Sequence, residues 1–292
     1  MRPIRLVPLA LVLGVAPASA QGGSDIYLAT VAPSPLGPKL ESPNNVTLRT
    51  GYDNQPFFVP DGSAILFTSI RDGQADIYRY TIASGRTTQL TDTPESEYSP
   101  TIMPGHTRFS VIRVEPDSAQ RLWAFALDGG NPRLLLPGVA PVGYQGWADP
   151  ATVVLFVLGT PATLQVANLT TGTARIVATD VGRSIAMAPG NGSIGFVQQR
   201  DGEPWLALLD VVTGRTDPVV KLPEAGFFAW MPDGSVVAGR GTQILLFQPD
   251  RGGDWSVLAD FSDGGIMGIT RIAVSAAGDR IAFVAADAAL GG

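Results

Sequence analysis

The stretch that decides the fold runs from residue 52 to residue 91 and reads YDNQPFFVPDGSAILFTSIRDGQADIYRYTIASGRTTQLT. It contains four short runs rich in β-branched and aromatic residues, namely QPFFV, AILFTSI, ADIYRYTI and RTTQLT. Turn residues separate these runs at Pro60-Asp61-Gly62, Arg71-Asp72-Gly73 and Ser84-Gly85. The pattern predicts four strands joined by tight turns. A single sheet of this size cannot bury both faces, so we expect it to stack against copies of itself.

Copies of this unit recur along the chain at a regular spacing. The turn after the first run of each unit is marked by Pro60, Pro104, Asp149, Pro189, Pro232 and Ala276. Successive spacings are 44, 45, 40, 43 and 44 residues. Four strands in a repeat of roughly 40 to 45 residues indicate a β-propeller blade, whereas a β-sandwich would show no fixed four-strand period. We therefore predict an all-β fold, a six-bladed β-propeller of four-stranded blades.

The sixth blade is expected to combine the two ends of the chain. Its segment at the C-terminal end has two strands, and residues 24–49 form two strands with none before them, where Asp25-Ile26-Tyr27 resembles Asp76-Ile77-Tyr78. We expect DIYLATVA to pair with RIAFVAA, which closes the ring and removes its exposed sheet edges. The predicted propeller is one domain, residues 21–292. Its blades cover approximately 52–91, 92–137, 138–179, 180–223, 224–262, and 263–292 plus 24–49.

Residues 1–20 have the three parts of a secretory signal peptide. Arg2 and Arg5 precede the apolar run LVPLALVLGVA, and Ala18-Ser19-Ala20 ends the segment with small residues. This order predicts cleavage after Ala20 and a periplasmic or secreted protein. The apolar run is too short to span a bilayer, so an integral membrane protein is not expected.

Charge and cysteine content exclude several classes of partner and site. Without Arg2 and Arg5 the chain has 18 basic and 26 acidic residues, a net charge of −8. No basic patch is available to neutralise phosphates, so nucleic acid is not an expected partner. The chain has no cysteine, so an exported form would depend on core packing and not on disulfides. We expect a monomer.

Three segments resemble the repeats of TolB-type propellers, a WD40-like (PD40-type) family. They are residues 52–80, residues 84–105 and the MPDG sequence at 231–234. The resemblance is strongest in the first two blades and concerns the propeller domain only. It implies a six-bladed fold and a role as an exported interaction module, but the same repeat serves many unrelated functions.

The residues needed for common catalytic and metal sites are scarce. His106 is the only histidine, and it follows Pro104-Gly105 in a predicted turn. A Ser-His-Asp arrangement and a zinc or other transition-metal site are therefore not expected. No G-x-S-x-G sequence, P-loop or dinucleotide fingerprint is present. We predict no catalytic residue and no transition-metal ligand.

One mouth of the central channel is the candidate binding site. Three places before each turn the residues are mostly small, as expected where six strands surround a narrow channel. Five to seven places before the turns they become polar and aromatic, and rims of this kind place variable side chains on a rigid scaffold. Aromatic residues there would supply contact area and charged ones orientation. The candidate ligand- or partner-binding residues are Asp53, Asn54, Gln55, Glu97, Tyr98, Tyr144, Arg183, Phe227 and Arg271.

Two classes of function remain open from the sequence. The first is an exported scaffold that binds a protein or peptide of the cell envelope at this mouth and needs no cofactor. The second is a calcium-assisted hydrolase or lactonase-like enzyme that uses the axial channel, with Asp53, Asn54 and Glu97 as oxygen ligands. The scarcity of His, Cys and clustered acids favours the first class.

Overall fold

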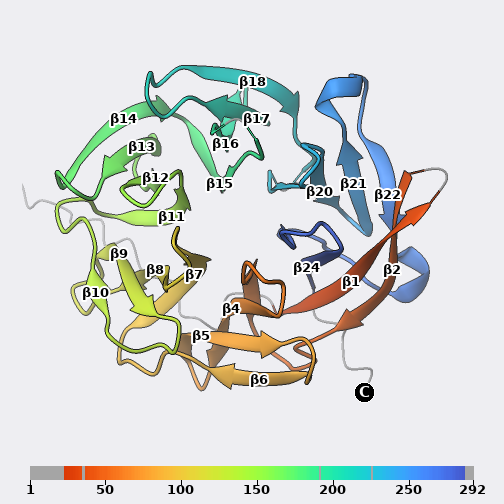
Figure 1. The fold of residues 1–292 in the computed structure, drawn as a ribbon, viewed down its shortest axis with the longest axis horizontal. Helices are drawn as coiled ribbons and strands as arrows, with labels where there is room; N and C mark the ends of the chain where they lie inside the picture. The colour runs from red at the N-terminus through yellow and green to blue at the C-terminus, as the bar shows by residue number, and fades with distance from the viewer. Residues whose placement is uncertain (1–22, 35–36, 191, 225, 287–292) are drawn as a thin grey trace, which may run out of the picture.

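Six four-stranded antiparallel sheets surround a central axis in the computed structural model, which describes residues 23–34, 37–190, 192–224 and 226–286 (Figure 1). This arrangement confirms the predicted six-bladed propeller. No helix in the described part of the chain is long and apolar enough to cross a membrane. The predicted signal peptide, residues 1–20, lies outside the described residues.

The strands of each blade follow one another from the axis outward. Blade 1 contains β3 (Asp53–Phe58), β4 (Ala64–Arg71), β5 (Gln74–Thr81) and β6 (Arg86–Gln89). Blade 2 contains β7 (Ser96–Ile102), β8 (Arg108–Val114), β9 (Gln120–Ala126) and β10 (Arg133–Leu134). Blade 3 contains β11 (Val142–Trp147), β12 (Thr152–Val157), β13 (Thr163–Asn168) and β14 (Thr173–Thr179).

The other three blades have the same order, with two short 3-10 turns in the outer connections. Blade 4 contains β15 (Val181–Met187), β16 (Ile194–Arg200), β17 (Glu203–Leu209) and β18 (Thr216–Lys221). Blade 5 contains β19 (Ala229–Trp230), β20 (Val236–Arg240), β21 (Gln243–Phe247) and β22 (Ser256–Asp260), with η2 (Pro249–Arg251) before β22 and η3 (Ser262–Gly264) after it. Blade 6 contains β23 (Ile272–Val274), β24 (Arg280–Ala286), β1 (Ser24–Ser34) and β2 (Gly37–Asn45).

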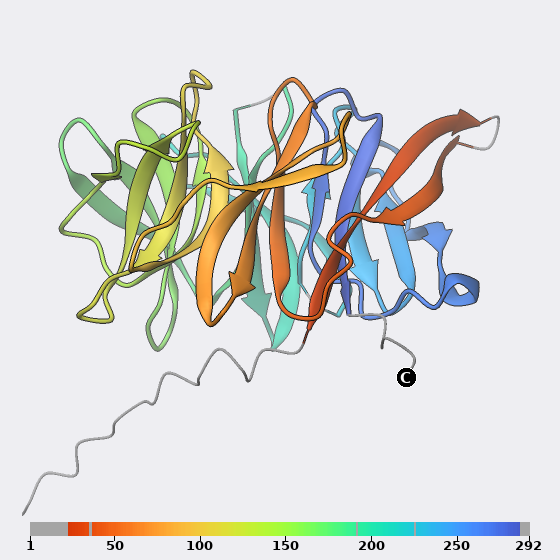
Figure 2. The ribbon, with the colours of Figure 1, turned by 90° about the horizontal axis from the view of Figure 1, so that it is seen from below.

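The two ends of the described chain meet in blade 6. β1 pairs with β24 in antiparallel register from Ser24↔Ala286 to Thr30↔Arg280. Figure 2 shows β1 and β2 (red) beside β24 (blue) at one side of the ring. The predicted closure by N-terminal outer strands and C-terminal inner strands is therefore confirmed.

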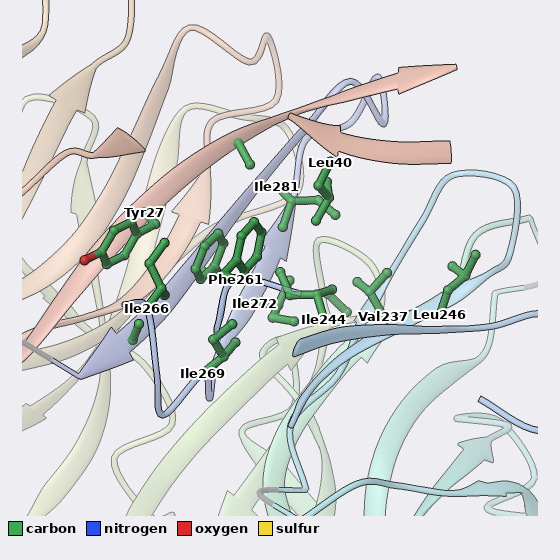
Figure 3. Close-up of a cluster of buried hydrophobic side chains, with 14 of the residues drawn as sticks. Tyr27, Leu40, Val237, Ile244, Leu246, Phe261, Ile266, Ile269, Ile272 and Ile281 are labelled. Carbon is green, nitrogen blue, oxygen red and sulfur yellow. The ribbon is translucent and has the colours of Figure 1, made fainter. Parts of the chain in front are cut away.

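Apolar clusters between neighbouring blades form the core. The second strand of each blade is apolar along most of its length because both of its faces are covered, as in the AILFTS run of β4. Figure 3 shows the cluster between blades 5 and 6, where Val237 and Ile244 face Ile272 and Ile281. Since a core of this kind lies between each pair of adjacent blades, every blade depends on two neighbours.

A repeated hydrogen-bond motif explains the Asp-Ile-Tyr similarity of the two segments. In blade 1 the Thr91 hydroxyl donates to Asp76 Oδ1 at 3.1 Å and accepts from the Ile77 amide at 2.8 Å. In blade 6 the Thr47 hydroxyl donates to Asp25 Oδ1 at 2.9 Å and accepts from the Ile26 amide at 3.0 Å. The aspartate therefore fixes the end of the fourth strand against the third in both blades.

Gly129 shows how closely blades 1 and 2 approach each other. It has φ +86°, and a Cβ atom at this position would lie 1.8 Å from the Leu90 carbonyl oxygen of blade 1. Gly105 has nearly the same φ, +88°, but no atom within 4 Å of its Cβ position. We expect Gly129→Ala to reduce the free energy of unfolding by about 2 kcal/mol more than Gly105→Ala, because only the first adds a backbone clash to the positive-φ strain. Urea unfolding of both variants measures the difference, and equal losses would contradict it.

Candidate functional site

Irregular pairing marks the first strands at the end of the channel where the candidate residues lie. Blades 1 to 4 each have a register shift between the first and second strands, at Asn54/Phe57, Tyr98/Thr101, Val142/Tyr144 and Val181/Ile185. Gln55 and Ser99 adopt positive φ angles of 59° and 55° within these shifts. A β-bulge bends its strand and redirects side chains. Phe227 and Arg271 precede the short first strands of blades 5 and 6, and the Arg271 carbonyl oxygen still accepts a hydrogen bond of 2.8 Å from the Val284 amide of β24.

A cavity of about 620 Å³ occupies the channel and is lined by the first strands of all six blades. Five of the nine candidate residues line it, namely Gln55, Tyr144, Arg183, Phe227 and Arg271. The small residues predicted around the channel also line it, among them Thr101, Gly146, Ala186, Ala229 and Ala273. The cavity extends to the turns at the other end of the strands, where Pro60, His106 and Met187 lie.

Arg271 spans the channel at the candidate mouth. Its Nη2 donates a hydrogen bond of 2.7 Å to the Tyr144 hydroxyl. Its guanidinium carbon lies 4.3 Å from the ring centroid of Phe227 and 4.9 Å from that of Tyr144. Arg271 belongs to blade 6 and Tyr144 to blade 3, which are opposite each other in a ring of six. A cation held over two aromatic rings therefore forms part of the cavity wall.

Tyr52 does not line the cavity but lies close enough to Arg271 and Arg183 for their charges to act on it. Burial raises the pKa of the Tyr52 phenol well above its usual range, and the positive charges of Arg271 and Arg183 oppose that rise. The phenol of Tyr52 therefore stays protonated even at the alkaline pH at which an ordinary tyrosine ionises. Burial also raises the pKa of Tyr98, which lies close to Tyr52 but does not line the cavity.

The two candidate acids are turned away from the channel and paired with arginines. Asp53 is fully buried, and its Oδ2 lies 3.2 Å from Arg49 Nη1. Glu97 is also fully buried and accepts a hydrogen bond of 2.9 Å from Arg113 Nε. Burial raises the pKa of both carboxyls. These pairs hold both carboxyls within blades 1 and 2, and neither acid lines the cavity.

The oxygen ligands considered for calcium do not converge. Asn54 donates to the Ser24 hydroxyl at 3.2 Å, while Asp53 and Glu97 face their arginines. Among the described residues there is no group of three or more His, Cys, Asp or Glu side chains that could hold a metal ion. The set Asp53, Asn54 and Glu97 therefore does not fit a calcium site.

Gln145 is a channel residue that the sequence did not indicate. Its Nε2 donates to the Ser99 carbonyl oxygen at 2.8 Å, which joins blade 3 to blade 2. It lies four places before the Asp149 turn, whereas the candidate residues lie five to seven places before the turns. The equivalent positions of the other blades hold Pro56, Pro100, Ile185, Phe228 and Ile272. No polar pattern in the sequence therefore marks this distance from the turns.

The buried Glu97 predicts a specific dependence of stability on pH. Burial raises its pKa to about 7, above the ordinary value of 4.5. The folded state therefore binds the proton more tightly than the unfolded state, and this contribution is lost as the pH rises through 7. We expect ionisation of Glu97 to lower the free energy of unfolding by up to about 3 kcal/mol between about pH 5 and pH 8, and Glu97→Gln to remove this part of the slope. Urea unfolding across this range measures it, and parallel curves for the two proteins would contradict the assignment.

Comparisons with known proteins agree on the fold. The six blades around an axial cavity define the class as a six-bladed β-propeller, and its fold is similar to that of TolB structures. A putative TolB from Agrobacterium tumefaciens matches 91% of this chain and 99% of its own length, with 17% identity and a TM-score of 0.70. TolB from Acinetobacter baumannii matches 93% of this chain and 65% of its own length, with 14% identity and a TM-score of 0.57.

An enzyme shares the same architecture. An oligogalacturonate lyase in complex with manganese matches 84% of this chain and 79% of its own length, with 15% identity and a TM-score of 0.57. No protein-family model matches the chain, and no curated protein matches it in sequence. At these identities the solved structures show the fold alone, so the resemblance to TolB-type propellers predicted from the repeats holds at the level of the fold.

Proposed function

We propose that this protein is an exported propeller scaffold that binds a protein or peptide segment in the axial channel. The observation that supports this most directly is the cavity of about 620 Å³, which is within the range of roughly 300 to 1,000 Å³ typical of ligand sites. Aromatic and cationic side chains from several blades meet at one end of it. The signal peptide predicted for residues 1–20 supports a location in the cell envelope.

The channel suits an extended segment better than a folded surface. Its walls come from six first strands, and their small residues leave a narrow space along the axis. Tyr144 and Phe227 are aromatic groups of the kind that provide much of the binding energy at protein interfaces. Because these groups sit on a closed ring of packed blades, binding requires little rearrangement of the scaffold.

The second candidate is a hydrolase or lactonase-like activity in the axial channel, because an oligogalacturonate lyase has a similar fold. The calcium ligands Asp53, Asn54 and Glu97 do not support its calcium-assisted form. Within the described chain, the residues that line the cavity include no Asp, Glu, Lys or Cys. The arrangement therefore offers aromatic and guanidinium contacts and favours binding over metal-assisted hydrolysis.

Selection from a library of displayed linear peptides tests the proposal. Ala273 lines the cavity, and Ala273→Phe would fill part of the channel. The matched control is Val212→Phe, because Val212 is 85% exposed and lies outside the cavity. We expect peptides selected on the wild type to bind Val212→Phe equally well and Ala273→Phe at least tenfold more weakly. Selected peptides that bind all three proteins alike would contradict a site in the channel.

A further inference from the structure

Arg183 and Arg271 differ from the other arginines near the axis in having no acidic partner. Arg49 pairs with Asp53, and Arg113 pairs with Glu97. In the described part of the chain, no carboxylate lies within ion-pair distance of Arg183 or Arg271. Both line the cavity, and both act electrostatically on Tyr52. Two positive charges therefore share one end of a channel that contains no described negative group.

This positive site is unexpected in an acidic protein. The chain has a formal net charge of −6, and the two acids predicted for the mouth, Asp53 and Glu97, are paired with their own arginines. A guanidinium group has five N–H donors, of which Arg271 uses one on Tyr144. Arg183 is exposed, and its side chain makes no hydrogen bond to another described residue. Donors that can bind an anion are thus available on both side chains.

The surroundings of the two guanidinium groups indicate which kind of anion fits. Tyr144 and Phe227 lie beside Arg271, and the wall further along the channel contains Ile185, Ile272 and Val274. A planar carboxylate matches the fork of a guanidinium group, and an apolar body attached to it would contact this wall. A small hydrated anion such as inorganic phosphate would leave the apolar wall without a partner.

We propose that Arg183 and Arg271 form a carboxylate-binding subsite at the mouth end of the channel, which receives a carboxylate carried on an apolar body. This rests on the proposed function, because the C-terminal end of a bound peptide would supply such a group. A free organic acid has the same chemistry, and the experiment separates the two sources.

Isothermal titration calorimetry of the full chain with three probes tests the subsite. The probes are N-acetyl-Phe-Leu with a free C-terminal carboxylate, its C-terminal amide, and 4-phenylbutyrate. We expect the free-carboxylate peptide to bind about ten- to a hundredfold more tightly than the amide, as the loss of a charge-assisted hydrogen bond implies. Its affinity should also fall as salt is added.

Variants of Arg183 test the assignment without disturbing the fold, because this side chain is exposed and unpaired among the described residues. Arg183→Gln should weaken binding of the free-carboxylate peptide about tenfold or more and leave binding of the amide unchanged. Arg183→Lys keeps the positive charge and should lose less of the affinity for the free-carboxylate peptide. Arg215→Gln is the matched control, since Arg215 pairs with Asp217 outside the cavity and should have no effect. Arg271→Gln is a second test at the other guanidinium, with thermal unfolding as the check on folding.

The outcomes separate this proposal from the proposed function. Equal binding of acid and amide, unchanged by Arg183→Gln, would overturn the carboxylate subsite and leave peptide binding intact. Binding of 4-phenylbutyrate alone, lost in Arg183→Gln, would support the subsite with an organic acid as its ligand and count against the peptide scaffold. Failure of all three probes to bind at millimolar concentration would overturn the subsite.

Discussion

A chain that lacks residues 21–50 is expected to lose its cooperative unfolding transition or to melt far below the full-length protein. The deletion removes β1 and β2, which are the two outer strands of blade 6. It also exposes one edge of β24, where Phe283 and Ile281 are fully buried in the closed ring. Losing this strand pairing and the packing against blades 5 and 1 should remove a large part of the roughly 5–15 kcal/mol of unfolding free energy that is typical of domains.

Thermal unfolding followed by circular dichroism measures this effect. Leu48→Ser is the control, because Leu48 is 74% exposed in the loop that follows β2. A synthetic peptide of residues 23–49, added to the truncated protein, should raise its unfolding temperature, because it can restore the third and fourth strands of the blade. A truncated protein that melts at the temperature of the full-length chain would show that these strands do not hold the ring closed.

Arg113→Ala is expected to cost about 3–5 kcal/mol of unfolding free energy. Arg113 is almost completely buried, contacts Glu97 at 2.9 Å and Glu95 at 3.6 Å, and lies 4.3 Å from the ring centroid of Trp123. The substitution leaves Glu97 buried without its positive partner, so the remaining carboxyl must either stay charged at high cost or take up a proton. The loss should therefore be larger at about pH 8 than at about pH 5.

The control for this variant is an ion pair of the same length at the surface. Arg215 and Asp217 also approach to 2.9 Å, but their side chains are 74% and 55% exposed. Exposed pairs contribute about 0–1 kcal/mol, so Arg215→Ala should have little effect. Chemical denaturation of both variants gives the comparison. Similar losses would mean that burial does not control the strength of the Arg113 pair.

The fold was predictable because its signals are local and repeated. The turns at Pro60, Pro104, Asp149, Pro189, Pro232 and Ala276 gave the blade period directly. The match between Asp25-Ile26-Tyr27 and Asp76-Ile77-Tyr78 identified the third strand of the closing blade, and both aspartates make the same hydrogen bonds. Local residue types fix these features, so no information about distant contacts was needed.

The site was only partly predictable because contacts between distant residues define it. The distance of each residue from its turn was enough to predict that Tyr144, Arg183, Phe227 and Arg271 lie at the channel. It did not predict that Arg271 contacts Tyr144, which is 127 residues away in the sequence. Glu97 was a candidate by the same rule, yet Arg113 on the adjacent strand holds it away from the cavity. The direction of a side chain at a register shift depends on the local backbone geometry, and an alignment of the repeats by their turns does not give that geometry.

Site-specific chemical modification tests most directly whether the channel is the binding site. The chain has no cysteine, so a single one can be introduced at Ser184, which lines the cavity, or at the exposed Val212. The rate of reaction with a maleimide is then measured with and without a saturating peptide selected from the library. Binding in the channel predicts that the peptide slows modification of Ser184→Cys at least tenfold and leaves Val212→Cys unchanged. Unchanged rates at both positions with the peptide bound would contradict binding in the channel.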